Sequence, residues 1–222
     1  MIRHDVEQGS VAWVNLRLGR PTASQAHRII TPRTMKPGAA QDKYLAELVA
    51  EWALGHSVTD DTSPFMDRGA GMEEEAVAWY ELRHNCDVDR VGFITLDDGS
   101  AGASPDGFVG DDGGLEIKVP AAHTHVAYLL DPLSDDYRAQ IQMNLLISER
   151  AYWDRLSYHP TLPKALTRFL RDEPFIKTLR ATLTDFTARL AAAKEQLLAL
   201  GCMPVEPATG PAKISTEFAG VP

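Results

Sequence analysis

The chain contains little cysteine, and its two cysteines form no recognisable site. Cys86 and Cys202 lie far apart in a sequence of 222 residues, and neither has a second ligand at metal-binding spacing. A disulfide framework or a zinc site needs several cysteines, or cysteines and histidines, at short intervals. We therefore expect both cysteines to be packing residues.

The sequence also lacks a long apolar run. No stretch reaches the roughly 20 apolar residues that span a bilayer, and the opening MIRHDVEQGS lacks the apolar centre of a signal peptide. We therefore expect a cytoplasmic protein with no membrane partner. Because 44% of the residues are hydrophobic and 24% are charged, the chain can bury one sizeable core. We expect residues 1–222 to form a single domain.

Positive charge is scarce, since 22 lysines and arginines face 31 aspartates and glutamates, for a net charge of −9. Phosphate binding usually depends on lysine and arginine, so this balance disfavours an extended nucleic-acid surface. Residues 1–40 differ, because they hold six basic residues and only two acidic ones. A small basic district in an acidic chain suits an enzyme that binds phosphate at one place and divalent cations at another. The alternative is a basic terminus that arose by chance.

Hydrophobic periodicity and turn residues predict a mixture of helices and strands. We expect helices over residues 22–30, 41–55, 71–84, 121–130, 135–148 and 173–200. We expect strands over residues 87–96, 102–110, 114–120 and 151–159, the first three as antiparallel neighbours. The tail 203–222 is rich in proline and small residues, which predicts a flexible or surface-tracking arm.

The stretch GASPDGFVGDDGGLEIKVP carries the clearest chemical pattern. If the chain turns at GDDGG, the two strands bring Asp106 within reach of Glu116, and Lys118 shares a face with Glu116 because side chains alternate along a strand. Two carboxylates and the Ile117 carbonyl are oxygen ligands that suit Mg²⁺. Lys118 could then orient an attacking water or stabilise charge on a phosphate. The alternative is a solvated hairpin with a cross-strand ion pair.

Four motifs in order resemble a known family. The segments SPDG and LEIKVP together resemble the metal site of the PD-(D/E)xK nucleases, and specifically of the lambda exonuclease and YqaJ-type viral recombinase group. AWVNLRLGRPTAS is similar to the N-terminal motif of that group, RGAGMEEEAVAWYE to its glycine and glutamate helix, and YRAQIQMNLLIS to its glutamine helix. These motifs span residues 13–148. The resemblance implies an α/β (α+β) fold with a restriction-endonuclease-like core, in which helices flank a central mixed sheet.

The same resemblance implies roles at the metal site. Asp106 and Glu116 become the principal ligands with the Ile117 carbonyl, and Lys118 becomes the motif lysine. Glu73 becomes a further acidic residue beside the metals because it lies four residues after a glycine of the motif; Glu74 and Glu75 remain alternatives. The family often has cysteine at the position of Val119, which we expect to be a core contact.

Further positions are implied on the helices. Gln140 would hydrogen-bond the attacking water or the motif lysine, although a glutamine on an exposed helix face is the alternative. Tyr137, one turn earlier, would line the site or pack. Arg17 suits the 5′-terminal phosphate because its planar guanidinium can donate two hydrogen bonds, with Ser24 and Ser104 as supporting donors.

For function, the resemblance implies a metal-dependent deoxyribonuclease of the alkaline exonuclease type. It would digest double-stranded DNA from 5′ to 3′, preferably from 5′-phosphorylated ends, with two Mg²⁺ ions per site and Mn²⁺ able to substitute. The 3′ single strand would serve recombination through a single-strand annealing protein, and the enzyme would be a homotrimer. Two alternatives remain open: a PD-(D/E)xK endonuclease or repair nuclease that needs no DNA end, and a DNA-binding protein without catalysis.

The remaining ligand candidates are histidines. His123 and His125 would chelate a transition metal if they lay on a strand. Their segment reads instead as a helix, in which residues i and i+2 diverge by about 200°. We therefore expect both side chains to face solvent or the substrate.

Overall fold

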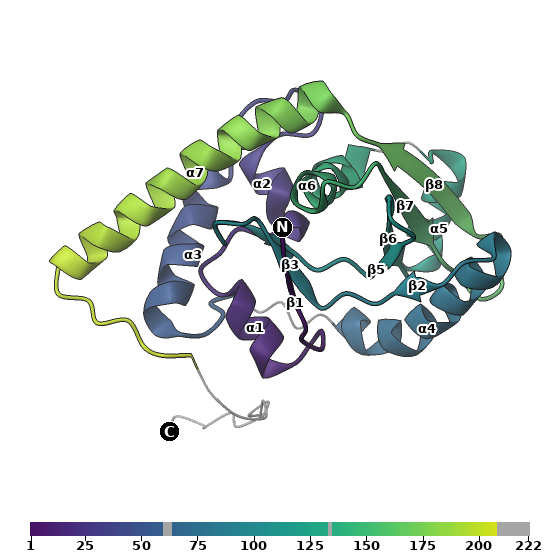
Figure 1. Cartoon of the computed structure of the whole chain (residues 1–222), viewed down its shortest axis with the longest axis horizontal. Coiled ribbons are helices and arrows are strands. Elements are labelled where there is room, and N and C mark those ends of the chain that lie inside the picture. Colours follow the sequence, from purple (N-terminus) through teal and green to yellow (C-terminus); the bar gives the residue numbers. More distant parts are fainter. Residues whose placement is uncertain (60–63, 133–134, 208–222) are drawn as a thin grey trace.

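The computed structural model describes residues 1–59, 64–132 and 135–207 (Figure 1). The helical segments are α1 (Val11–Arg17), η1 (Ala23–Gln25), α2 (Ala26–Ile29), α3 (Gln41–Leu54), α4 (Pro64–His84), α5 (Ala122–Leu130), η2 (Asp135–Tyr137), α6 (Arg138–Ser148) and α7 (Glu173–Ala199). The strands are β1 (Ile2–His4), β2 (Val88–Asp89), β3 (Phe93–Thr95), β4 (Gly102–Ala103), β5 (Gly107–Val109), β6 (Gly113–Lys118), β7 (Tyr152–Ser157) and β8 (Ala165–Leu170). Most of the arm expected at 203–222 lies outside the described residues, from 208 onward.

The strands form two sheets. A five-stranded sheet has the order β2-β5-β6-β7-β8, and a three-stranded sheet has the order β1-β3-β4. β6 and β7 are parallel, while the other pairs of the larger sheet are antiparallel. The predicted mixed sheet flanked by helices is therefore confirmed.

The strands predicted over 87–96 and 102–110 are wrong in extent. Each segment is broken into two short strands that belong to different sheets, because β2 pairs with β5 whereas β3 pairs with β4. Gly92 lies at the first break, where a Cβ atom would come within 1.9 Å of the Val6 carbonyl oxygen. Only glycine allows this approach of two backbones.

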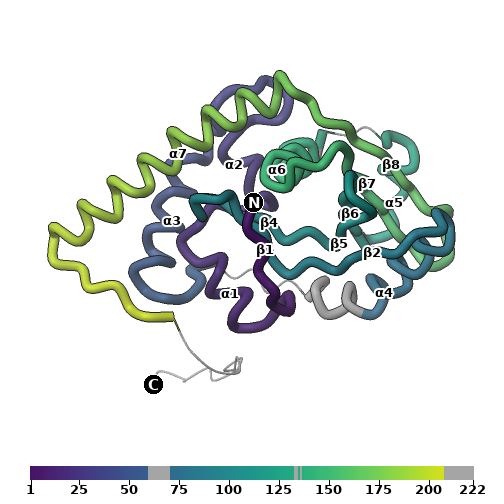
Figure 2. The backbone as a smooth tube through the Cα atoms, viewed as in Figure 1, coloured from purple at the N-terminus to yellow at the C-terminus, as the bar shows by residue number. Residues whose placement is uncertain are grey.

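The parallel pair requires a crossover connection. Figure 2 follows the chain from β6 through α5 and α6 to β7, which lies directly beside β6. The register places Glu116 opposite Arg155 and Lys118 opposite Ser157. The crossover brings α6 against the strand that carries the candidate site, which explains how residues far apart in sequence meet there.

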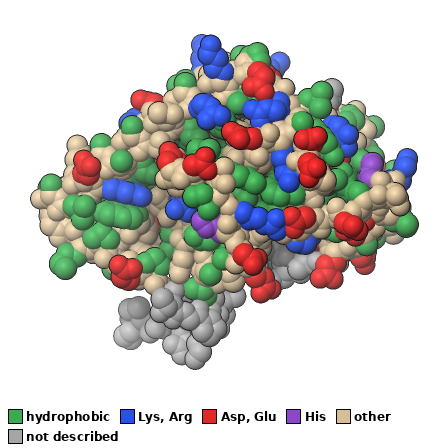
Figure 3. All heavy atoms as spheres, in the orientation of Figure 1, with side chains coloured by type: hydrophobic (Ala, Val, Ile, Leu, Met, Phe, Trp, Pro, Cys, Tyr) green, Lys and Arg blue, Asp and Glu red, His purple; other side chains and the backbone are tan. Residues whose placement is uncertain are grey.

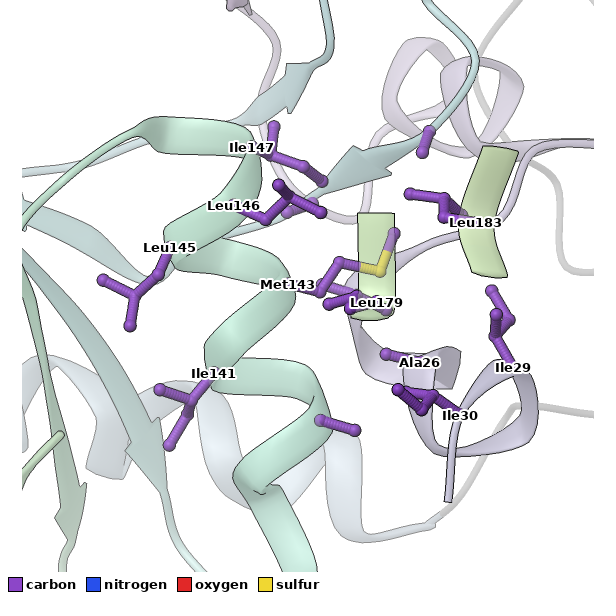
Figure 4. Close-up of a cluster of buried hydrophobic side chains, with 14 of the residues drawn as sticks. Ala26, Ile29, Ile30, Ile141, Met143, Leu145, Leu146, Ile147, Leu179 and Leu183 are labelled. Atoms are coloured by element: carbon purple, nitrogen blue, oxygen red, sulfur yellow. The ribbon is translucent and has the colours of Figure 1, made fainter. Parts of the chain in front are cut away.

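The main core lies between α6 and the surrounding helices. α6 contributes a run of buried apolar residues because both of its sides are covered, and α7 adds one stripe at helical spacing. Figure 4 shows Met143, Leu146 and Ile147 on the side of α6 that faces α2 and α7, whereas Ile141 and Leu145 point to its other side. The labelled members are Ala26, Ile29, Ile30, Ile141, Met143, Leu145, Leu146, Ile147, Leu179 and Leu183.

A second, smaller cluster lies between α4 and the larger sheet. It joins Ala76 and Tyr80 of α4 to Leu115, Ile117 and Leu156 of the sheet, and Val119 packs against it, as expected for a core contact. Across the described residues, none of the helices combines the length and apolar character that a membrane crossing demands.

The surface carries both signs of charge side by side. Figure 3 shows lysine and arginine next to aspartate and glutamate over the viewed face. Within the basic N-terminal district, Arg3 pairs with Asp89 and Arg28 pairs with Glu47. Part of the local positive charge is thus neutralised by acids from later elements.

Candidate functional site

The hairpin of β5 and β6 positions Asp106 beside the second strand. Gly107 pairs with Leu115, so Asp106 lies just outside the ladder, opposite the continuation of β6. Its carboxylate Oδ2 accepts a hydrogen bond from the Ile117 backbone N–H at 2.5 Å. The side chain of Asp106 therefore replaces the next main-chain partner that a longer β5 would have supplied.

The sheet geometry also orients the Ile117 carbonyl. On the other edge of β6, the Lys118 carbonyl accepts from the Tyr158 N–H at 2.8 Å. Because successive residues of a strand direct their backbone groups to opposite edges, the Ile117 carbonyl points away from β7. It therefore lies on the same edge as Asp106, where a cation would need it.

Glu116 is 3% exposed and is surrounded by donors. Its Oε1 accepts from Gln140 Nε2 at 2.6 Å and pairs with Lys118 Nζ at 2.7 Å, while Oε2 accepts from Asn144 Nδ2 at 3.2 Å. A buried carboxylate is stable only when it is paired and hydrogen-bonded in this way. The contacts also fix the orientation of the carboxylate against β6.

Lys118 connects the acids to an aromatic ring. Burial alone would lower the pKa of Lys118, but the carboxylates of Glu116 and Asp106 raise it, so the ammonium stays charged. Its Nζ lies 5.1 Å from the ring centroid of Tyr137, which also packs edge-on against Tyr128. Tyr137 thus both lines the site and packs beneath it.

The charges around Asp106 would favour the binding of a cation. Burial raises the pKa of Asp106 well above its usual range, and the charges of Glu116 and Glu73 raise it further, against the opposing effect of Lys118. A divalent cation would relieve this repulsion. Two carboxylates and a main-chain carbonyl are also the hard oxygen donors that such ions prefer, so the residues fit one.

No group of three or more histidine, cysteine or acidic side chains at metal-binding spacing occurs among the described residues. The acidic side chains of α4 do not join Asp106 and Glu116 in such a group. Glu73 pairs with Arg90 at 2.5 Å, Glu75 accepts from the Tyr158 hydroxyl at 3.2 Å, and Glu74 is exposed. Of the three, Glu73 is the one that acts electrostatically on Asp106.

A second cluster of polar groups adjoins the first. Ser104, two residues before Asp106, accepts hydrogen bonds from Trp13 Nε1 at 2.9 Å and from Arg17 at 3.0 Å. The Arg17 guanidinium also stacks over the Trp13 ring, 4.2 Å from its centroid. Through Ser104, this arginine is held close to the segment that carries the acidic pair.

Ser24 is brought toward this cluster only indirectly. Thr22 forms a bridge with Gly102, which precedes the segment of Ser104, and the Thr22 and Ser24 hydroxyls share a hydrogen bond of 3.3 Å. Within the described part of the chain, no hydrogen bond joins Ser24 to Arg17. The exposed Ser24 hydroxyl is therefore linked to the segment of Ser104 only through Thr22 in the described part of the chain.

The expectation for one histidine is wrong. His123 is exposed, but His125 is fully buried and faces neither solvent nor substrate. Its Nε2 donates to the Pro163 carbonyl at 2.8 Å, which leaves Nδ1 to accept from the Ser157 hydroxyl at 2.8 Å. His125 therefore fastens α5 to β7 and the following loop.

Two residues at the site have no counterpart in the sequence-based expectations. Asn144 donates to Glu116, and Arg90 pairs with Glu73. The spacing of Asn144, four residues after Gln140 on a helix, places both on one face and could have revealed it. Arg90 gives no such signal, because it lies between two short strands of different sheets.

Comparison with known proteins agrees with this geometry. Residues 12–151 match the model of the YqaJ-like viral recombinase domain. The structure is similar to that of an alkaline exonuclease from Laribacter hongkongensis, with 31% identity and a TM-score of 0.76 over 86% of this chain and 97% of that one. The same bacterial exonuclease in complex with dAMP gives a TM-score of 0.75.

A more distant structure agrees in fold alone. It is a phage-related exonuclease from Haemophilus somnus 129PT, 12% identical, with a TM-score of 0.64 over 82% of this chain and 98% of that one. None of the curated protein sequences matches the chain.

Proposed function

Since the chain belongs to the YqaJ-like viral recombinase family, we propose that it digests double-stranded DNA from 5′-phosphorylated ends toward the 3′ end, with Mg²⁺ as its cofactor. It is a nuclease with the PD-(D/E)xK type of fold. The polarity, the choice of Mg²⁺ and the preference for an end are our proposal. Its main support is that the Arg17 cluster and the acidic pair are joined through the short segment from Ser104 to Asp106.

The metal site would use residues of β6 and the segment before β5. Asp106, Glu116 and the Ile117 carbonyl would hold two Mg²⁺ ions, and Mn²⁺ could replace them. Such ions polarise a phosphate and lower the pKa of a bound water. Gln140 and Asn144 keep the Glu116 carboxylate in one orientation, which leaves Asp106 to complete the cation site.

The remaining residues would act on the DNA. Lys118 can donate to a phosphate oxygen or to the attacking water, because its charged ammonium already lies at the acidic pair. Arg17 would bind the terminal 5′ phosphate, which carries more charge and more free oxygens than a phosphate within a strand. Ser24 and Ser104 would support it. An end-binding residue fixed this close to the acids would favour removal of nucleotides from the terminus.

The wider assembly follows from the family alone. The product would be a 3′ single strand used in recombination, a single-strand annealing protein would receive it, and three copies of the chain would form a ring. Action in the cytoplasm is part of the same proposal. Sedimentation or light scattering would test the trimer, because a monomeric mass at micromolar concentration contradicts it.

The direct test compares ends on labelled DNA. The protein should degrade linear duplexes with 5′-phosphate ends faster than those with 5′-hydroxyl ends, and should leave closed circles intact. Arg17→Ala should lose most of this preference, by about tenfold or more, since a charge-assisted hydrogen bond is worth about 1.5 to 3 kcal/mol. Arg33→Ala, which removes an exposed charge from the same district, should keep it.

Two results would contradict the proposal. Equal rates on both ends would show that the terminal phosphate is not read. Cleavage of closed circles would favour the alternative, an endonuclease that shares the metal site but needs no end.

A further inference from the structure

Arg90 has a firmly fixed backbone next to the acidic pair. Gln8 Nε2 donates a hydrogen bond to the carbonyl of the neighbouring Val91 at 2.7 Å. The same Gln8 nitrogen also donates to the Pro105 carbonyl at 2.8 Å. Pro105 directly precedes Asp106. Gln8 therefore ties the segment of Arg90 to the segment that positions Asp106, so that the two cannot move apart independently.

The side chain of Arg90 is free to change partners. It is 53% exposed, and its NH2 group contacts Glu73 Oε1 at 2.5 Å. The neighbouring Asp89 is already taken by Arg3, with NH2 at 2.8 Å from Oδ1. Within the described part of the chain, Glu73 is thus the only carboxylate in ion-pair contact with Arg90.

Two carboxylates form the site, Asp106 and Glu116, and the charge of Glu73 on α4 acts on Asp106 from outside it. Lys118 compensates Glu116, and Arg90 compensates Glu73, while the hydrogen bond that Asp106 accepts within the described residues comes from a backbone N–H. A cation arriving at Asp106 would attract Glu73, whose charge already acts on Asp106, and so compete with Arg90 for it. An ion pair this exposed is weak, so the competition costs little.

We propose that Arg90 is an exchangeable counter-ion: it holds Glu73 when no divalent cation is bound, and it contacts a backbone phosphate of the DNA once a cation takes Glu73. This inference rests on the proposed function, because it requires a cation and DNA at the same site. The released guanidinium stands at the edge of the site on a fixed backbone. Its charge and its planar set of donors suit a phosphate near the one that is cleaved.

The first measurement is cation binding without DNA. Calorimetric titration with Mn²⁺ should show that Arg90→Ala binds the ion about two- to fivefold more tightly than the unchanged protein, because the competing charge is gone. Arg83→Ala removes an equal charge from the exposed end of α4 and should change this affinity little. In a Glu73→Gln background, Arg90→Ala should have no further effect.

The second measurement is DNA binding as a function of salt. With Ca²⁺ as the divalent ion, fluorescence anisotropy on a linear duplex should show weaker binding by Arg90→Ala. The slope of log affinity against log salt should fall by about one, as for the loss of one phosphate contact. Arg90→Lys should keep the slope because it keeps a point charge. Arg83→Ala should keep it as well.

The outcomes distinguish a failure of the proposed metal site from a failure of the proposed role of Arg90. If the unchanged protein binds no Mn²⁺, the metal site of the proposed function fails, and the role of Arg90 fails with it. If the protein binds Mn²⁺ but Arg90→Ala binds it equally or more weakly, only the exchange is overturned. An unchanged salt slope in Arg90→Ala would overturn its contact with phosphate.

Discussion

The helical layer and the larger sheet differ in what they bury. Around α6 and α7 the core is apolar, with side chains such as Leu179 and Phe186 fully excluded from water. In the described part of the chain, the buried charged side chains all come from β6 and β7: Glu116, Asp154 and Arg155. Apolar burial stabilises the fold, whereas buried charge is costly unless it is well paired. The helical layer therefore supplies stability, and the sheet holds the candidate site.

α6 belongs to both regions. Ile141 and Met143 enter the apolar core, while Gln140 and Asn144 reach the Glu116 carboxylate. The packing of the helical layer thus determines where the donors of the site lie. The contrast predicts that substitutions in the sheet reduce activity more than stability, and that substitutions facing the helical layer do the reverse.

The largest effect is expected for Asp106→Asn. The amide keeps the shape of the carboxylate and can still accept from the Ile117 N–H, but it removes a charged ligand. DNA degradation should fall by about 10³-fold or more, as for loss of a preorganised charged group. The melting temperature should stay level or rise, because the repulsion from Glu116 disappears. A large loss of stability with little loss of activity per folded molecule would contradict this division of roles between the helical layer and the sheet.

A sharper test uses two glutamines of one helix. Gln140 donates to Glu116, whereas Gln142 donates to the Leu170 carbonyl and accepts from the Asp172 N–H. Gln140→Ala should lower activity about tenfold with little change in stability. Gln142→Ala should leave activity per folded molecule intact but cost about 1 to 2 kcal/mol, because two partly buried hydrogen bonds between α6 and the start of α7 are lost. Urea denaturation and initial rates measure both; similar profiles would contradict the division.

The smallest effect concerns the start of α7. Asp172 caps this helix by accepting from the Phe175 N–H, and the pairing with Arg138, followed by this cap, lowers the pKa of Asp172. A lowered pKa means that the stabilisation is present above the unfolded-state pKa near 3.9 and is lost as the pH falls below it. Asp172→Ala should cost about 1 kcal/mol at pH 7. The difference from the unchanged protein should shrink below about pH 4 in thermal melts.

The predictable part of the fold is the part that depends on neighbours in sequence. The helix Gln41–Leu54 follows from its apolar spacing, and Gly55 ends it in a left-handed conformation, with φ of 70°. The hairpin of Asp106 and Glu116 follows from its turn residues and from the alternation of side chains. In both cases the pattern and the structure share the same short stretch of chain.

Three elements escape the patterns for different reasons. β1 is short and exposed, so it has no apolar period. α1 is not among the predicted helices, although the sequence contains one signal for it: Ser10 caps the helix by accepting a hydrogen bond from the Trp13 N–H. β8 alternates only weakly, because two of its six residues are buried, two are partly buried and two are exposed. Partners of the site such as Arg90 depend on contacts between distant segments, which no local pattern encodes.

The parallel pairing of β6 with β7 has a consequence for the order in which the enzyme is made. The hairpin with Asp106 and Glu116 can form as soon as β6 has left the ribosome, because its contacts are local. Gln140 and Asn144, and the strand at Arg155 that flanks Glu116, are synthesised later. A nascent chain that ends before β7 therefore leaves one edge of β6 unpaired, and Glu116 lacks the strand that flanks it in the folded protein.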